Sequence, residues 1–114
     1  MSRMDLQRSA VEMLKDWREW AEKVAHAAEE TLPQSEVYVL GSVVRGDYTG
    51  GSDIDILIVS DMVPEGLLKR AEVKSSIEDL ADLPQVHHIQ IHLTRRCEAK
   101  NYIRRAGKHI LKLR

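Results

Sequence analysis

Two short motifs near the middle of this 114-residue chain carry side chains that can do chemistry. Gly41–Ser42 follows the strand-forming run 37–40, so the chain leaves a strand through a residue without a Cβ and offers backbone N–H groups and a hydroxyl to an anion. Asp53 and Asp55 begin a second apolar run. Because side chains alternate across a strand, the two carboxylates face the same side, roughly 6–7 Å apart. Such carboxylates repel each other unless a cation lies between them, and Mg²⁺ prefers oxygen ligands. The pattern predicts a site where a metal and a phosphate group meet.

Arg45 lies in the spacer between the two motifs, and two roles are open to it. Its guanidinium could contact a phosphate of a bound nucleotide, or it could pair with Asp47 or Asp55 and hold the loop. The glycine spacing of residues 41–46 matches a P-loop, but Asp47 and Tyr48 stand where that motif requires Lys and Ser or Thr. The P-loop interpretation is therefore excluded.

The spacing of these residues resembles the signature of a known superfamily. Gly41–Ser42, ten intervening residues and then Asp53-Ile54-Asp55 are similar to the DNA polymerase β-like nucleotidyltransferases, and the short chain resembles their minimal nucleotidyltransferase (MNT) branch. The resemblance implies Mg²⁺-dependent transfer of a nucleoside monophosphate, with AMP from ATP as the expected case, and loss of pyrophosphate. It also implies that Gly41 and Ser42 hold the triphosphate, and that Asp53 and Asp55 are the catalytic residues that bind metal.

The family's third carboxylate lies on a later strand, where this chain has Gln90. In the predicted strand 86–93, His88 and His92 share the face of Gln90. Three apolar side chains alternate with them and form the buried face: Ile89, Ile91 and Leu93. An amide cannot act as a base or supply negative charge. We therefore expect slow or absent catalysis unless His88 or His92 takes the proton instead.

The elements that position these residues alternate along the chain. In the first half of the chain, the periodicity predicts a helix over about 5–31 and strands at 37–40 and 54–59. In the second half it predicts a helix between Pro64 and Pro84, a strand at 86–93 and a helix at about 95–106, which Thr94 could cap. Residues 109–113 are expected to form a short strand or a docking tail. In the last helix Ala99, Ile103 and Ala106 are expected to point inward. The predicted fold is α/β, with a small mixed sheet of three or four strands, helices packed on one face, and the Gly–Ser turn and both acids on the open face.

Composition limits the class of protein. The length and an apolar content of 43% fit one domain over residues 1–114. The net charge of −1 provides no broad positive field, so a nucleic-acid partner is not expected, although the basic cluster in the last twenty residues leaves room for RNA or an acidic partner. No apolar run approaches 18 residues, no signal peptide begins the chain and Cys97 has no partner cysteine. We expect a cytoplasmic protein without membrane contact.

A chain this small has little surface for an acceptor pocket, so we expect another chain to supply acceptor recognition. MNT-like proteins are often paired with a small helical HEPN protein, in some cases as the antitoxin that adenylylates a HEPN toxin. The resemblance therefore implies NTP as substrate and a HEPN-type partner in a toxin–antitoxin pair, and it leaves formation of a homo-oligomer open. The alternative is a catalytically degenerate nucleotide-binding or antitoxin module that neutralises its partner by contact.

Overall fold

The computed structural model of the chain describes residues 13–47, 53–84 and 87–114, in which helices and strands alternate. The elements follow in the order α2 (Trp17–Thr31), β1 (Glu36–Leu40), α3 (Ser42–Arg45), β2 (Ile54–Val59), α4 (Leu67–Leu80), β3 (Ile89–Thr94), α5 (Arg96–Ala106) and β4 (Ile110–Lys112). Residues 48–52 of the spacer, the first residues of the predicted helix 5–31 and residue 86 of the predicted strand lie outside the described part. Among the described residues, no helix is both long enough and apolar enough to cross a membrane.

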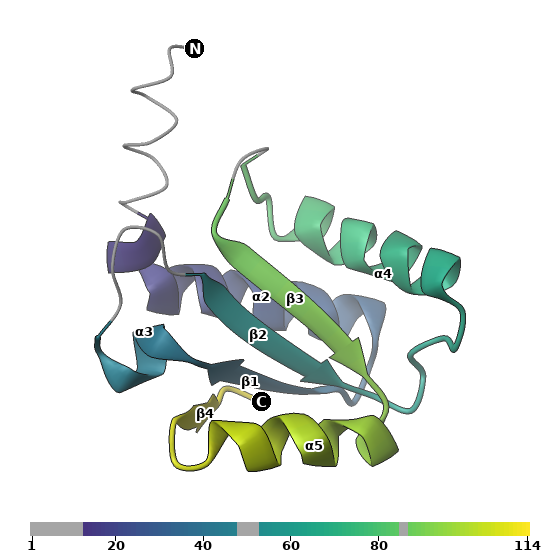
Figure 1. The fold of residues 1–114 in the computed structure, drawn as a ribbon. Helices are drawn as coiled ribbons and strands as arrows, with labels where there is room; N and C mark the ends of the chain where they lie inside the picture. The colour runs from purple at the N-terminus through teal and green to yellow at the C-terminus, as the bar shows by residue number, and fades with distance from the viewer. Residues whose placement is uncertain (1–12, 48–52, 85–86) are drawn as a thin grey trace.

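The strands form one sheet in the order β3-β2-β1-β4 (Figure 1). β1 is antiparallel to both β2 and β4, whereas β2 and β3 are parallel. The parallel pair is joined by α4, as a parallel connection requires a crossover rather than a tight turn. The predicted α/β class with a small mixed sheet is confirmed.

The main core lies between one face of the sheet and the helices α2 and α4. The central strand β2 contributes Ile54, Ile56 and Ile58, each fully buried, and each contributes about 1.5–3 kcal/mol of hydrophobic free energy. α2 faces them with small side chains such as Ala21, Ala25 and Ala28, which let the helix approach the sheet closely. Strand alternation and helical spacing thus place this layer as the sequence predicts.

The opposite face of the sheet is only partly covered, and α5 is the helix that covers it. Leu57 and Val59 of β2 form a second cluster there with Leu40 and Ala99, and Tyr102 packs against its edge. This differs from the expectation that the helices share one face. α5 can cross to this face because its own apolar stripe has apolar β2 side chains to bury beneath it.

The inward side of α5 also differs from the prediction. Ile103 is exposed, at 36% of its surface, whereas Tyr102 is half-buried between Ala99 and Ala106. Residues 99, 102 and 106 follow helical spacing as well as 99, 103 and 106 do, so the sequence alone could not choose between them. The face that α5 packs against decides the choice.

Two helix boundaries differ from the prediction, and hydrogen bonds explain both. Thr94 is the last residue of β3 rather than a helix cap, because its hydroxyl donates to the Ile58 carbonyl (3.2 Å) and α5 begins one residue later than expected. At the other end of the chain, a turn at Asp16 interrupts the predicted first helix. The Asp16 carbonyl accepts from the N–H groups of Glu19 and Trp20 as α2 begins.

An Arg70–Glu98 ion pair fixes α5 to the rest of the fold. Arg70 of α4 donates to both Glu98 oxygens, at 2.8 and 3.3 Å, and also to the Leu93 carbonyl. Glu98 accepts a further hydrogen bond from the backbone N–H of Arg95, at the start of α5. The hydrogen bonds from Arg70, followed by the one from Arg95, hold the pKa of Glu98 below its ordinary value. One carboxylate therefore joins the start of α5 to α4.

Because the pKa of Glu98 is lowered in the folded state, the stability that it contributes is fully present above the unfolded-state value of about 4.3. It is lost as the pH falls through the folded value. We expect Glu98→Gln to lower the free energy of unfolding at neutral pH. Below about pH 4.3, the free energy of unfolding should fall less steeply with pH in the variant than in the wild type. Urea denaturation at a series of pH values measures both effects.

The matched control is Glu72→Gln, which removes an exposed glutamate of α4 that has no ion-pair partner in the described part of the chain. We expect it to change the stability at neutral pH less than Glu98→Gln does. Equal effects of the two substitutions would show that the Arg70–Glu98 pair does not anchor α5.

Candidate functional site

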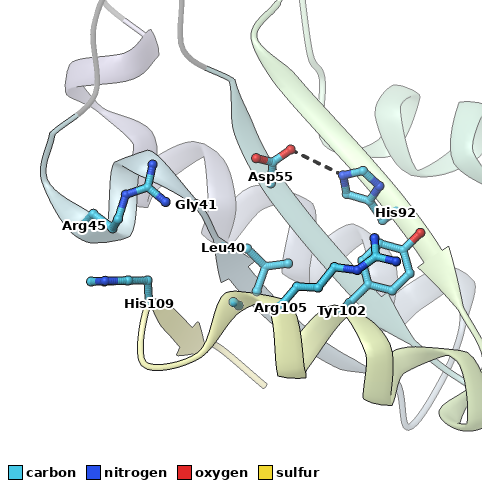
Figure 2. Close-up of a pocket in the computed structure, with 9 residues that line it drawn as sticks. Leu40, Gly41, Arg45, Asp55, His92, Tyr102, Arg105 and His109 are labelled. Carbon is cyan, nitrogen blue, oxygen red and sulfur yellow. Dashed lines mark hydrogen bonds and ion pairs between the residues drawn. The ribbon is translucent and has the colours of Figure 1, made fainter.

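A cavity of about 320 Å³ lies on the α5 side of the sheet, where α5 leaves the beginning of β2 uncovered. The end of β1 and the turn into α3 supply Leu40, Gly41 and Arg45, and the neighbouring strands β2 and β3 supply Asp55 and His92. The remaining wall comes from α5 and the residues after it: Tyr102, Arg105, Ala106 and His109. Figure 2 shows Asp55 and His92 on one side of the cavity, with Arg45 and His109 at its other end.

Gly41 allows the turn after β1 to touch the carboxylate of Asp55. Its backbone has φ +88° and ψ −153°, a region that residues with a Cβ avoid. A Cβ built at this position would lie 3.0 Å from the Asp55 Oδ2 atom, which is too close for an ordinary contact. The antiparallel pairing of Leu40 with Asp55 brings the turn next to the acid, and the absence of a side chain at residue 41 leaves room for the carboxylate there.

Ser42 begins α3 directly after this contact. The N–H groups of Ser42 and Val43 have no partner inside the helix, because the first residues of a helix precede any carbonyl that could accept from them. Ser42 is half-buried next to the cavity, although it does not line it. The turn therefore leaves hydrogen-bond donors beside the Asp55 carboxylate.

Each of the two predicted acids lies near a histidine of the neighbouring strand or the residues that lead into it. The Nε2 atom of His92 is 3.3 Å from Asp55 Oδ1, and the Tyr102 ring packs near the imidazole, with ring centroids 5.6 Å apart. Asp53 is exposed, and its Oδ1 atom is 3.8 Å from Nδ1 of His88. Unlike Asp55, Asp53 does not line the cavity. Asp55 lies within β2, whereas Asp53 directly precedes the strand, which begins at Ile54.

Gln90 lies beside Asp55 in the parallel pairing of β2 and β3. It is exposed, and it alternates with the buried side chains of Ile89 and Ile91, so it faces the same side as the acid. The register predicted from the sequence is therefore observed. Among the described residues, no group of three or more His, Cys, Asp and Glu side chains is arranged to hold a metal ion.

Arg45 pairs with Asp47, one of the contacts that its position left open. Its Nε atom lies 3.2 Å from Asp47 Oδ1, so the ion pair forms with Asp47 and not with Asp55. Both side chains are exposed. Arg45 also lines the cavity. An exposed ion pair contributes at most about 1 kcal/mol, so Arg45 can leave Asp47 for a stronger anion.

The sequence did not identify the wall that α5 supplies. Tyr102, Arg105 and His109 complete the cavity, and their only signals were helical spacing and the basic composition of the chain after residue 95. The cavity consequently has a carboxylate on one side and the guanidinium groups of Arg45 and Arg105 on others. Such an arrangement suits a ligand with several negative charges that is accompanied by a cation.

Comparisons with known proteins agree with this geometry. The family model for the nucleotidyltransferase domain matches residues 21–108, a range that holds every residue of the cavity except His109. A crystal structure of a presumed nucleotidyltransferase has 29% sequence identity and a TM-score of 0.64, covering 82% of this chain and 96% of that chain. A second, from Sulfolobus solfataricus, has 25% identity and a TM-score of 0.60, covering 96% of this chain and 83% of that chain. No curated protein matches the chain.

The contact between Gly41 and Asp55 can be tested by adding a single methyl group. We expect Gly41→Ala to lower the free energy of unfolding by about 1–3 kcal/mol, because its backbone conformation is one that alanine avoids. We also expect the Asp55 carboxylate to move away from the new Cβ, which would change the NMR signals of the His92 imidazole.

Gly46→Ala is the matched control, since Gly46 also has a positive φ, +84°, but a Cβ there would meet no atom within 4 Å. We expect it to cost about 1 kcal/mol and to leave the His92 signals unchanged. If the two variants change the His92 signals equally, the Gly41–Asp55 contact does not shape the site.

Proposed function

The chain belongs to the nucleotidyltransferase domain family, and we propose that it transfers a nucleoside monophosphate from ATP to an acceptor hydroxyl in a Mg²⁺-dependent reaction. In this reaction the acceptor oxygen forms a bond to the α-phosphorus, the bond from that phosphorus to the pyrophosphate breaks, and the acceptor proton is released. The observation that carries the proposal is the contact of the Gly41 turn with the Asp55 carboxylate at the wall of the cavity. This contact brings hydrogen-bond donors for a phosphate next to an oxygen ligand for a metal.

The acids beside the cavity fit a hard divalent cation. Asp53 and Asp55 offer carboxylate oxygens at the start of β2, and their side chains are 48% and 36% exposed, so they are open to a ligand. Gln90 adds an amide oxygen next to Asp55. Mg²⁺ usually takes only one or two carboxylates from a protein and completes its shell with phosphate oxygens and water. When bound, the ion would neutralise negative charge on the phosphates.

The remaining walls suit the other parts of ATP. Arg45, Arg105 and His109 offer cationic or hydrogen-bonding groups to the triphosphate, together with the N–H groups at the start of α3. Leu40 and Tyr102 offer apolar surface to the nucleoside. A volume of about 320 Å³ is at the lower end of the range of small-ligand sites, so the cavity would hold the nucleotide and the acceptor would approach from outside.

The acceptor in this proposal is a small helical protein of the HEPN type, paired with this chain as toxin and antitoxin. Support comes from the MNT-like spacing of Gly41–Ser42 and Asp53–Asp55, and from the cavity volume of about 320 Å³, which leaves little room for an acceptor beside the nucleotide. We propose that His92, which contacts Asp55 and lines the cavity, takes up the proton of the acceptor hydroxyl.

A second candidate function has its own supporting observation. Gln90 lies beside Asp55 on the face where the resemblance implies a third carboxylate, and an amide cannot take up the acceptor proton. The alternative is a nucleotide-binding module that neutralises its partner by contact and transfers nothing. Both candidates require the same nucleotide site, and they differ only in turnover.

Calorimetric titration of ATP tests the site that the two candidates share. We expect binding that is at least about tenfold tighter with Mg²⁺, and loss of this difference in Asp53→Asn/Asp55→Asn, since the metal would lose both carboxylates. Asp79→Asn/Asp82→Asn removes two exposed acids elsewhere and is expected to bind as the wild type does. ATP binding that does not depend on Mg²⁺ in any of the three proteins would refute the metal–nucleotide site.

Labelling with α-³²P-ATP separates the two candidates. If the chain is an enzyme, wild-type protein with Mg²⁺ labels a co-purified helical partner, and Asp53→Ala abolishes the label. If it is a binding module, the wild type gives no label and Gln90→Asp gains activity, because the substitution supplies the missing carboxylate. If neither the wild type nor Gln90→Asp labels any acceptor although both bind Mg²⁺–ATP, nucleotidyl transfer is contradicted as the function.

A further inference from the structure

The exposed surface of α5 carries positive charge without compensating acids. Arg96, Lys100 and Arg104 are exposed and follow at four-residue spacing, and Lys108 continues the series just beyond the helix. We call these four residues the α5 basic face. By the rise of an α-helix, Arg96 and Arg104 are separated by about 12 Å along the helix axis. The face therefore presents a row of cations rather than a single charge.

Partners for this row are largely absent in the described part of the chain. Arg96 has one exposed contact, 3.7 Å from its Nε atom to Asp61 Oδ2. In the ranges 13–47, 53–84 and 87–114, no carboxylate lies within 4 Å of the charged nitrogens of Lys100, Arg104 or Lys108. The only acid of α5 is Glu98, which Arg70 already engages. The positive charge of this face is available to an external group.

The row does not stabilise the helix that carries it. Like charges at i and i+4 destabilise a helix by about 0.2–0.5 kcal/mol per pair, and this applies to Arg96 with Lys100 and to Lys100 with Arg104. The helix dipole disfavours Arg96 in the first turn and favours Arg104 in the last turn, so it does not explain the row as a whole. The other two long helices differ, because α2 and α4 both mix acidic and basic side chains on their exposed surfaces. Helix stability therefore does not account for the α5 basic face.

The surroundings of the row favour a protein over a nucleic acid as its partner. Ile103 is 36% exposed among the cations, so the row offers an apolar contact beside its charges, which a protein surface can use. Single-stranded nucleic acid would require aromatic side chains for stacking, and the only aromatic residue of α5, Tyr102, faces the cavity. The net charge of −1 also provides no broad field for a polyanion.

We infer that the α5 basic face is the docking surface for an acidic surface of the acceptor protein. The inference rests on the proposed transfer to a protein, and it adds where that protein binds and what charge it presents. The same helix contributes Tyr102 and Arg105 to the cavity and Lys100 and Arg104 to the exposed face. An acceptor held along α5 would thus lie beside the bound nucleotide.

The test uses fluorescence anisotropy with three labelled probes at low ionic strength. The probes are a helical peptide with glutamates at four-residue spacing around one leucine, the same peptide with Gln for Glu, and a single-stranded oligouridine. We expect the acidic peptide to bind most tightly, and Lys100→Gln/Arg104→Gln to weaken it about fivefold or more, as expected for the loss of two exposed charge pairs. Ile103→Ser should weaken it further, because a leucine contact would be lost.

The matched control is Lys15→Gln/Lys69→Gln, which removes two exposed positive charges outside α5 and should change peptide binding by less than about twofold. An equal loss in the two double variants would overturn the inference, because only net charge would then matter. Oligouridine that binds more tightly than the peptide and is lost with Lys100 and Arg104 would overturn it too, in favour of a nucleic-acid surface.

Calorimetry of Mg²⁺–ATP on the same variants keeps this inference distinct from the proposed function. We expect Lys100→Gln/Arg104→Gln to bind Mg²⁺–ATP as the wild type does, since neither residue lines the cavity. Normal ATP binding without peptide binding would refute the docking surface alone. Peptide binding that is lost with Lys100 and Arg104 in a protein that binds no ATP would support the docking surface and refute the nucleotide site.

Discussion

Strand β2 is enclosed on both faces at its end but on only one face at its start, and this asymmetry shapes the rest of the molecule. Its isoleucines are buried under α2 and α4, while Leu57 and Val59 are buried under α5 on the other side. Asp55 shares the face of Leu57 because side chains alternate along a strand, and Asp53 directly precedes β2. α5 does not extend over the start of β2, so the acids remain accessible beside a core that excludes water.

The turn at Gly41 uses this open part of the sheet. The pairing of Leu40 with Asp55 brings the donors of the turn next to the carboxylate, and a Cβ at residue 41 would occupy the space between them. α5 supplies a further wall of the cavity, and the Arg70–Glu98 pair holds the start of this helix against α4. One helix can thus serve the nucleotide with its inner residues and an acceptor with its outer ones.

Much of the site could be predicted from the sequence because it depends on local rules. The alternation in β2 and β3 was sufficient to place Gln90 on the same side as Asp55, and the β-strand followed by glycine identified the turn. The walls supplied by Tyr102, Arg105 and His109 were missed because they depend on which face of the sheet α5 covers. That choice is a long-range packing effect, and helical spacing in α5 allowed Ile103 as readily as Tyr102 to point inward.

Binding of a metal–nucleotide complex between Gly41, Asp55 and α5 is the central claim, and paramagnetic Mn²⁺ in place of Mg²⁺ tests it most directly. In ¹H–¹⁵N spectra with ATP present, we predict that the amide signals of Gly41, Asp55 and Tyr102 weaken first, and that Asp53→Asn/Asp55→Asn prevents this loss. Signal loss centred instead on the amides of acidic residues of α4, such as Glu78 and Asp79, or an unchanged loss in the double variant, would contradict the claim.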